Sequence, residues 1–146
     1  MRIKIINGPN LNMLGKRQPE LYGNSSFEAY FSTLATTFTG HELSCFQSNH
    51  EGAIIDEIQE MMTGTYDGLV INPAAYTHTS IAIADALAML SIPIAEVHIS
   101  NIYEREPFRQ HSFVHPLAAV TIVGKGLDGY RMAIEFLLDK KENLHN

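Results

Sequence analysis

Hydrophobic residues in this 146-residue chain follow two patterns that alternate along its length. Short apolar runs recur five times, and runs of this kind are typical of strands in a parallel sheet. We expect strands at residues 2–6, 42–47, 68–71, 94–97 and 118–123. Between most of them, apolar residues recur with the i, i+3, i+4, i+7 spacing of an amphipathic helix. This spacing predicts helices at about residues 27–38, 80–90 and 127–139, and one more that follows Ser48 and ends near Gly64.

The alternation of strands and helices predicts an α/β fold in a single domain covering residues 1–146. Short right-handed crossovers favour a flavodoxin-like, doubly wound, five-stranded parallel sheet with the strand order 2-1-3-4-5. Ser25 with Glu28, and Ser48 with Glu51, have capping-box spacing and predict two helix starts. Residues 101–115 are expected to form a loop with one helical turn, and the tail at residues 140–146 is expected to fray.

Three of the predicted strands are followed directly by asparagine or histidine residues. The first reaches Asn7 and Asn10, the third reaches Asn72 and then His78, and the fourth reaches His98. Parallel strands place their carboxyl ends at one edge of the sheet, where ligands bind. The sequence therefore predicts one site at this edge, with Asn72 and His78 as hydrogen-bonding groups suited to the hydroxyls of a ligand.

His98 is the strongest candidate for a general acid or base, because imidazole titrates near neutral pH. Glu96 lies two residues earlier on the same face of the strand, and we expect it to fix the ring tautomer of His98. The backbone N–H groups of Ile99 and Ser100 are placed to cradle a carboxylate. Two other interpretations stay open at this point: a purely structural His98, and a metal site that uses Glu96 and His98 as ligands.

The segment after the first strand is long for a compact domain. About 18 residues lack any helix or strand pattern, which is typical of a functional lid, here placed at about residues 11–24. The lid carries Arg17 and Tyr22. Free tyrosine has a pKa of about 10, and one arginine at ~4.5 Å offers about 3–4 kcal/mol toward lowering it. Arg109 is a candidate second cation. The residues alone support two interpretations of Tyr22 equally well: a catalytic base, or a residue that packs within the lid.

Composition narrows the choice of partners. Residues are 45% hydrophobic, the net charge is −6, and no apolar run approaches a membrane span. An acidic chain is a poor binder of nucleic acid. Cys45 stands in a strand-like run and is expected in the core, and a lone cysteine fits a reducing cytoplasm. Four of the ten cationic side chains lie in two candidate site loops and favour a small anionic ligand: Lys16, Arg17, Arg105 and Arg109.

Two motifs are given structural interpretations. The residues Gly124, Gly126 and Gly129 match G-x-G-x-x-G, but no strand follows to supply the acidic ribose ligand of a dinucleotide site. We expect a tight turn with close helix packing there. His111 and His115 have i, i+4 spacing without a carboxylate motif around them, which makes a metal site there the less favoured interpretation.

Together, these segments resemble the type II 3-dehydroquinate dehydratase family, in order, from residue 1 to about residue 138. The matching motifs are Asn7-Gly8-Pro9-Asn10-Leu11-Asn12 through Arg17 and Tyr22-Gly23; Gln47-Ser48-Asn49-His50-Glu51-Gly52; Ile71-Asn72-Pro73-Ala74-Ala75-Tyr76-Thr77-His78-Thr79-Ser80; Glu96-Val97-His98-Ile99-Ser100-Asn101; Arg105-Glu106-Pro107-Phe108-Arg109; and Gly124-x-Gly126-x-x-Gly129-Tyr130. The chain departs mildly from the family pattern at Ala74, where many members carry glycine, and at Ala84 and Gln110.

The resemblance implies a flavodoxin-like fold and the dehydration of 3-dehydroquinate to 3-dehydroshikimate, without metal or other cofactor. The reaction is a trans elimination through an enolate. By resemblance, Tyr22 removes the C2 proton as tyrosinate and Arg17 lowers its pKa. His98 protonates the departing hydroxyl, Glu96 orients His98, and Asn10 helps to stabilise the enolate.

The resemblance also implies how the substrate is held. Ile99 and Ser100 would bind its carboxylate, and Asn72, His78 and Arg109 would hold its ring hydroxyls. The family assembles as a dodecamer of trimers, in which Asp85 reaches a neighbour's site. Two alternatives from other classes remain: a metal-assisted lyase or hydrolase, and a non-enzymatic interaction module.

Overall fold

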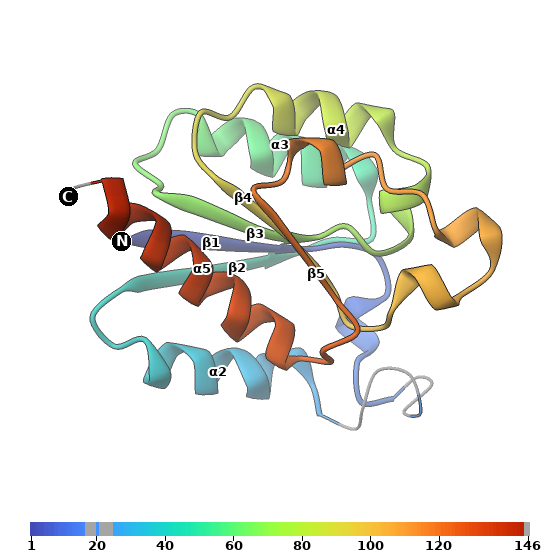
Figure 1. The fold of residues 1–146 in the computed structure, drawn as a ribbon, viewed down its shortest axis with the longest axis horizontal. Helices are drawn as coiled ribbons and strands as arrows, with labels where there is room; N and C mark the ends of the chain where they lie inside the picture. The colour runs from blue at the N-terminus through green and yellow to red at the C-terminus, as the bar shows by residue number, and fades with distance from the viewer. Residues whose placement is uncertain (17–19, 21–24, 145–146) are drawn as a thin grey trace.

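A computed structural model describes residues 1–16, 20 and 25–144 of the chain (Figure 1). Its five strands are all parallel and lie in the order β2-β1-β3-β4-β5, which confirms the predicted topology. Their bounds are β1 (Arg2–Asn7), β2 (Glu42–Gln47), β3 (Gly68–Asn72), β4 (Ile94–His98) and β5 (Val120–Val123).

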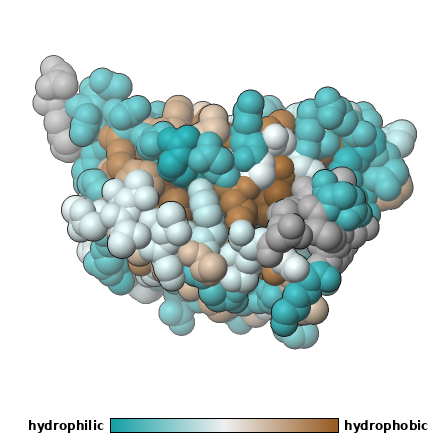
Figure 2. Space-filling view, turned by 90° about the horizontal axis from the view of Figure 1, so that it is seen from below, coloured by the Kyte–Doolittle hydropathy of each residue, from teal (hydrophilic) through white to brown (hydrophobic). Residues whose placement is uncertain are grey.

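Helices cover both faces of the sheet. The helices α2 (Phe27–Thr37) and α5 (Asp128–Leu144) lie on one face, and α3 (Glu51–Met61) and α4 (Ile81–Ala88) lie on the other (Figure 1). Figure 2 shows the α2 side from below, where brown hydrophobic atoms are visible near the centre, between teal hydrophilic residues above and mostly white residues of intermediate hydropathy below. Within the described residues, no helix is long and apolar enough to reach across a membrane.

The register of the sheet aligns the strand ends predicted to carry the site. Asn7 pairs with Asn72 across β1 and β3, and Ile71 pairs with Glu96 across β3 and β4. Because the strands are parallel, their polar carboxyl ends therefore lie side by side at one edge. His98 closes β4 at the same edge and pairs with Val123 of β5.

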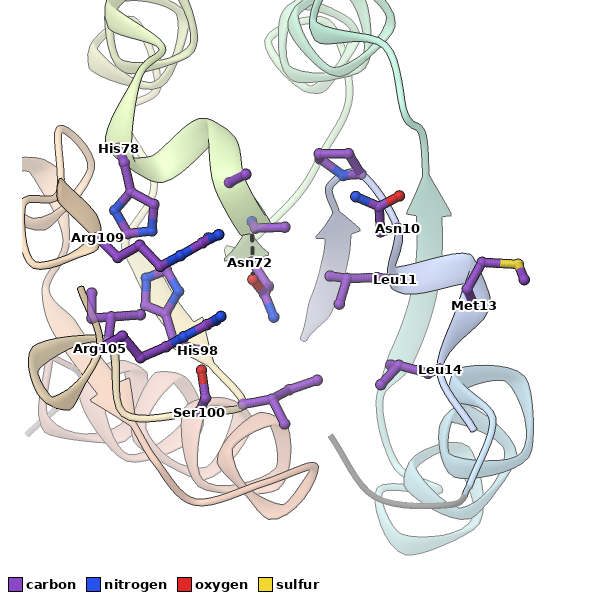
Figure 3. A pocket seen from close by; sticks show the side chains of 15 residues that line it. Asn10, Leu11, Met13, Leu14, Asn72, His78, His98, Ser100, Arg105 and Arg109 are labelled. Atoms are coloured by element: carbon purple, nitrogen blue, oxygen red, sulfur yellow. Dashed lines mark hydrogen bonds between the residues drawn. The ribbon is translucent and has the colours of Figure 1, made fainter. Parts of the chain in front are cut away.

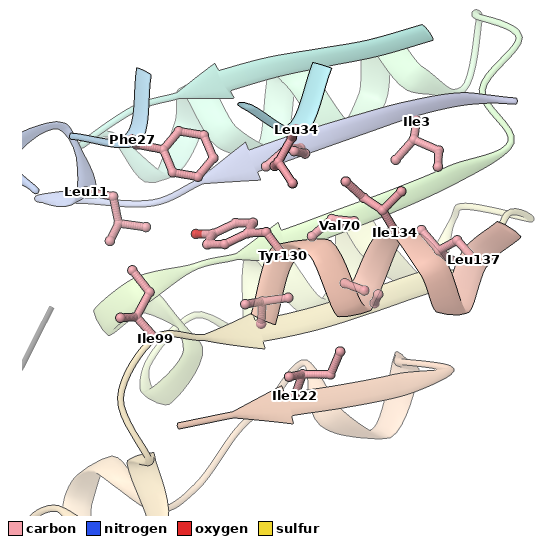
Figure 4. Packing of buried hydrophobic residues seen from close by; sticks show 14 of the residues in the cluster. Ile3, Leu11, Phe27, Leu34, Val70, Ile99, Ile122, Tyr130, Ile134 and Leu137 are labelled. Atoms are coloured by element: carbon pink, nitrogen blue, oxygen red, sulfur yellow. The ribbon is translucent and has the colours of Figure 1, made fainter. Parts of the chain in front are cut away.

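The core consists of one apolar cluster on each face of the sheet. On the α5 face, the buried residues include Leu34 of α2, Val70 of β3 and Ile134 of α5 (Figure 4). The Tyr130 ring is fully buried among them and lies 4.9 Å from the Phe27 ring, centroid to centroid. This packing fixes α2 and α5 against the strand ends.

Two predicted capping boxes are wrong in detail. Ser26, and not Ser25, caps α2, because its Oγ accepts the Ala29 N–H at 3.2 Å. The α3 helix begins at Glu51 with His50 as its N-cap. Ser48 lies too far ahead of the first turn to cap it, and its Oγ accepts the N–H of His50 at 3.0 Å instead.

The last helix does not end at residue 139 as predicted, because residues 140–144 continue α5 as far as Leu144. Lys141 explains the extension, because its Nζ lies 2.7 Å from Asp67 Oδ1. Asp67 Oδ2 also accepts the Arg2 N–H at 2.7 Å, so the helix end is fixed beside the start of β1. Residues 145–146 lie outside the described part.

Two further expectations need correction. Cys45 is exposed and does not belong to the core, because β2 is an edge strand of the sheet. The loop over residues 101–115 contains more than one helical turn. Its 3-10 turns are Ile102–Glu104 and Pro107–Arg109, and a third turn, His115–Leu117, begins at its end.

Candidate active site

A cavity of about 180 Å³ opens at the carboxyl ends of β1, β3 and β4. Its opposite walls come from segments far apart in the sequence (Figure 3). Asn10, Leu11 and Leu14 form one side, and His78, His98, Ser100, Arg105 and Arg109 form the other, with Asn72 between them. The structure therefore brings Asn10, Asn72, His78 and His98 together at one cavity, whereas Asn7 lies at the same edge but does not line it.

The β1 side is a short, anchored turn. Asn10 has a left-handed backbone with φ of 70°, and its N–H donates to Asn49 Oδ1 at 2.9 Å. Leu11–Met13 form a 3-10 turn, and Leu11 and Leu14 are buried in the core. The first residues of the predicted lid are thus held in place by a hydrogen bond and by burial of two leucines. Arg17 and Tyr22 lie outside the described residues.

Asn72 forms the floor of the cavity and is almost fully buried. Its Oδ1 accepts the N–H of Ala74 at 3.1 Å, and its Nδ2 donates to the Tyr130 hydroxyl at 3.0 Å. Ala74 has a φ of 53°, which is the conformation that favours glycine. The Asn72 side chain thus holds the strained start of the next turn.

His78 is prepared to accept a hydrogen bond. Its Nδ1 lies 2.7 Å from the carbonyl oxygen of His111, which can only accept, so Nδ1 carries the hydrogen. Burial is the main cause that lowers the pKa of His78, and the positive charges of its neighbours lower it further. The ring is therefore neutral at pH 7, and Nε2 remains as an acceptor.

The β4 side contains a buried acid–imidazole pair. Glu96 is fully buried and His98 is 4% exposed, and Glu96 Oε1 lies 2.7 Å from His98 Nε2. Ser112 Oγ donates to the same Oε1 at 2.6 Å, and Thr121 Oγ1 donates to Oε2 at 3.0 Å. Burial alone raises the pKa of Glu96, but these hydrogen bonds outweigh it, so the pKa lies below its ordinary value.

The ionised carboxylate determines the tautomer of His98. Glu96 Oε1 can only accept, so Nε2 of His98 donates to it, and Nδ1 is left for a ligand in the cavity. The expectation that Glu96 orients this ring agrees with the geometry. Sequence reasoning missed Ser112 and Thr121, because neither belongs to the motifs at the strand ends.

Two arginines give the cavity a positive rim. Arg105 and Arg109 line it, and Arg109 Nε forms an ion pair with Glu106 Oε2 at 2.9 Å. Ile99 and Ser100 also line the cavity. Asp85 is exposed on α4 and is not part of the cavity wall of its own chain.

The candidate metal ligands do not form a cluster. Within residues 1–16, 20 and 25–144, no group of three or more His, Cys, Asp or Glu side chains could hold a metal ion. His115 instead has its Nδ1 2.8 Å from Thr121 Oγ1, and His111 packs edge-on against the ring of Phe113. Both histidines therefore serve local structure.

Comparison with known proteins identifies the family of this chain. The family model described as Dehydroquinase class II matches residues 1–138. The chain belongs to this family. Among its relatives, a 3-dehydroquinate dehydratase of Anoxybacillus flavithermus is 48% identical over 97% of both chains. A catabolic 3-dehydroquinase 1 of Aspergillus terreus is 53% identical, and the matched region spans 91% of this chain and 88% of the Aspergillus protein.

Solved structures of the dehydroquinase family share the fold. A type II dehydroquinase from Butyrivibrio crossotus superposes with a TM-score of 0.89 at 52% identity, covering 94% of this chain and 97% of that one. A 3-dehydroquinate dehydratase-like protein from Bifidobacterium longum is more distant, with a TM-score of 0.67 at 29% identity over 94% of both chains. The flavodoxin-like architecture is thus that of the family.

Proposed function

We propose that this protein dehydrates 3-dehydroquinate to 3-dehydroshikimate in the shikimate or quinate pathway, by a trans elimination through an enolate. The observation that carries the proposal is membership of the class II dehydroquinase family over residues 1–138. The buried Glu96–His98 pair, which opens onto a cavity with a positive rim, supports the mechanism.

His98 is the general acid of the proposed reaction. When the enolate collapses, the C1–O bond breaks and the departing hydroxyl takes a proton from His98 Nδ1, leaving as water. In this step the His98 ring carries a hydrogen on both nitrogens: Nε2 donates to the Glu96 carboxylate, and Nδ1 donates to the departing hydroxyl. General acid catalysis of this kind contributes about 10²–10⁴-fold to a rate.

Tyr22 is the proposed base and takes the C2 proton as tyrosinate, with Arg17 lowering its pKa. Both residues lie outside the described part of the chain, so their roles rest on the family resemblance. Lowering the pKa of a tyrosine by three units requires about 4 kcal/mol, which one or two nearby arginines supply. Asn10, at the cavity wall, assists in stabilising the enolate.

The remaining cavity residues hold the substrate in this proposal. Backbone N–H groups of Ile99 and Ser100 bind its carboxylate. Asn72, His78 and Arg109 bind its ring hydroxyls, with His78 Nε2 as an acceptor. The reaction needs no cofactor, and the enzyme works in the cytoplasm as a homo-oligomer, a dodecamer of trimers, in which Asp85 of one chain reaches the site of a neighbour.

The growth of ultraviolet absorbance from the conjugated enone product tests this function. Purified protein, first treated with a chelator and freed of metal, is mixed with 3-dehydroquinate at neutral pH. We expect the absorbance to grow at the same rate before and after metal removal. No growth in either sample would refute the activity. Growth that is lost with the metal and restored by adding it would refute the cofactor-free mechanism.

A further inference from the structure

The buried phenol of Tyr130 lies directly behind the cavity floor. Its ring is fully buried, and its hydroxyl is within hydrogen-bond distance of two strand-end amides. Asn7 Oδ1, at the end of β1, lies 2.7 Å away, and Asn72 Nδ2, at the end of β3, lies 3.0 Å away. Of these three side chains, only Asn72 lines the cavity.

The direction of each hydrogen bond follows from counting donors. The Oδ1 atom of Asn72 accepts the Ala74 N–H, so its Nδ2 must donate to the phenol. The single hydroxyl hydrogen of Tyr130 then needs an acceptor, which is Asn7 Oδ1. The opposite orientation of the Asn7 amide would leave this hydroxyl facing two donors. The Asn72 amide is thus held at both ends, with one N–H hydrogen remaining.

The glycine motif before α5 explains how a tyrosine reaches this position. Gly124 and Gly126 have φ angles of 72° and 60°, so the chain turns sharply after β5. A Cβ atom on Gly129 would lie 3.2 Å from Val97 Cγ1, so α5 begins in close contact with β4. The next residue is Tyr130. The predicted tight turn is confirmed, and it directs a side chain toward the site.

We infer that Tyr130 is a positioning residue, whose hydroxyl holds the Asn72 amide so that its remaining N–H hydrogen can bind a hydroxyl group of the substrate. The inference rests on the proposed function, in which Asn72 binds the substrate ring. Tyr130 itself does not line the cavity and acts only through Asn72. Its hydroxyl stays protonated at neutral pH, because burial raises the pKa of Tyr130.

The variant Tyr130→Phe removes only the hydroxyl. Loss of one neutral hydrogen bond corresponds to a change of about two- to tenfold, and we expect KM to rise by that factor. An interaction equally strong in the ground and transition states changes KM alone, so we expect kcat to stay within about twofold of the wild type. Tyr66→Phe, a matched control away from the cavity, should change neither constant. Circular dichroism at the assay temperature verifies that each variant is folded.

A double-mutant cycle with Asn72→Ala separates positioning from a general structural effect. If Tyr130 acts through Asn72, adding Tyr130→Phe to Asn72→Ala should raise KM no further. An equal rise in both backgrounds, or an unchanged KM in Tyr130→Phe, would overturn the inference. If Tyr130→Phe does not fold, Asn7→Ala removes the acceptor instead, and an unchanged KM there would overturn it as well. Absence of activity in the wild type would refute the proposed function, a separate result.

Discussion

At the scale of single residues, the Glu96 carboxylate accepts hydrogen bonds from side chains other than His98. Thr121 donates its hydroxyl hydrogen to Glu96 Oε2, so it must accept from His115 Nδ1. A chain of hydrogen bonds therefore runs from the exposed His115 ring to the buried carboxylate. Thr121, together with Ser112 on the other carboxylate oxygen, stabilises the ionised form of Glu96 and keeps it available to His98.

Thr121→Val should destabilise the protein in a pH-dependent way. The pKa of Glu96 is depressed by folding, so its ionisation stabilises the fold above the unfolded-state pKa of about 4.3 and is lost as the pH falls through the folded-state pKa. Removing one donor raises that folded-state pKa. We expect the free energy of unfolding to fall by about 1.5–3 kcal/mol at pH 7, and by less at pH 4.

Urea unfolding followed by circular dichroism at both pH values measures this effect. Thr121→Ser keeps the hydroxyl and serves as the control, with a smaller loss that does not depend on pH. Equal losses for Thr121→Val at pH 7 and pH 4 would show that the Thr121 hydroxyl does not act through the charge of Glu96.

Tyr22→Phe should abolish most turnover while leaving binding intact. The proposed base is the Tyr22 oxygen, and general base catalysis contributes about 10²–10⁴-fold. We expect kcat to fall by that factor, and the Kd of the product, measured by calorimetry, to change by less than about threefold. Tyr103→Phe changes an exposed tyrosine and should be neutral. A Tyr22→Phe enzyme that keeps near-normal turnover would show that Tyr22 is not the base.

At the scale of elements, the sequence predicts the strands and their polar ends because both are local patterns. Asn7, Asn72 and His98 could be placed at one edge because a parallel sheet admits no other arrangement. Glu96, two residues before His98, could be predicted as its partner, but the partners that are distant in sequence could not. Tyr130 and Asn7 are 123 positions apart, and Thr121 and Glu96 are 25 apart. Such pairs depend on how helices and loops pack, which hydrophobic spacing does not specify.

Gly8→Ala should separate the ends of β1 and β3. A Cβ atom on Gly8 would lie 2.3 Å from the carbonyl oxygen of Pro73, and the Gly8 N–H donates to the Asn72 carbonyl at 2.8 Å. Relief of the clash requires movement of backbone, so we expect a loss of about 3 kcal/mol in the free energy of unfolding, measured with urea. Gly52→Ala in α3 meets nothing within 4 Å and should be neutral or stabilising by up to about 1 kcal/mol. Equal stability of the two variants would contradict the close approach at Gly8.

Lys141→Met should release the end of α5. Its ammonium holds Asp67, and this contact is the first cause that lowers the Asp67 pKa, followed by the N–H of Arg2. We expect faster amide hydrogen exchange in residues 140–144, with a global loss of at most about 1 kcal/mol because the pair is partly exposed. That loss should disappear as the pH falls through the folded-state pKa of Asp67. Lys140→Met is the control, and an equal increase in exchange there would contradict the role of Lys141.

At the scale of the whole molecule, the charge at the cavity is opposite in sign to the net charge of the protein. The protein carries a net charge of −6, yet Arg105 and Arg109 both line the cavity, where Ser100 and the end of β4 meet the loop. The positive rim concentrates an anionic substrate at the site while the rest of the surface repels other anions. Asp85 lies outside this cavity, so its proposed role requires a second chain.

Complementation between inactive variants tests that role. If a site combines His98 of one chain with Asp85 of a neighbour, Asp85→Ala and His98→Ala should each be severely impaired alone. Co-expressed in equal amounts, they should recover about one quarter of wild-type activity, because half of the chains keep His98 and half of their neighbours keep Asp85. Co-expression of Glu96→Ala with His98→Ala is the control. It should recover nothing, because both residues belong to one chain and lie 2.7 Å apart. Failure of the first pair to exceed this control would show that each site is complete within one chain.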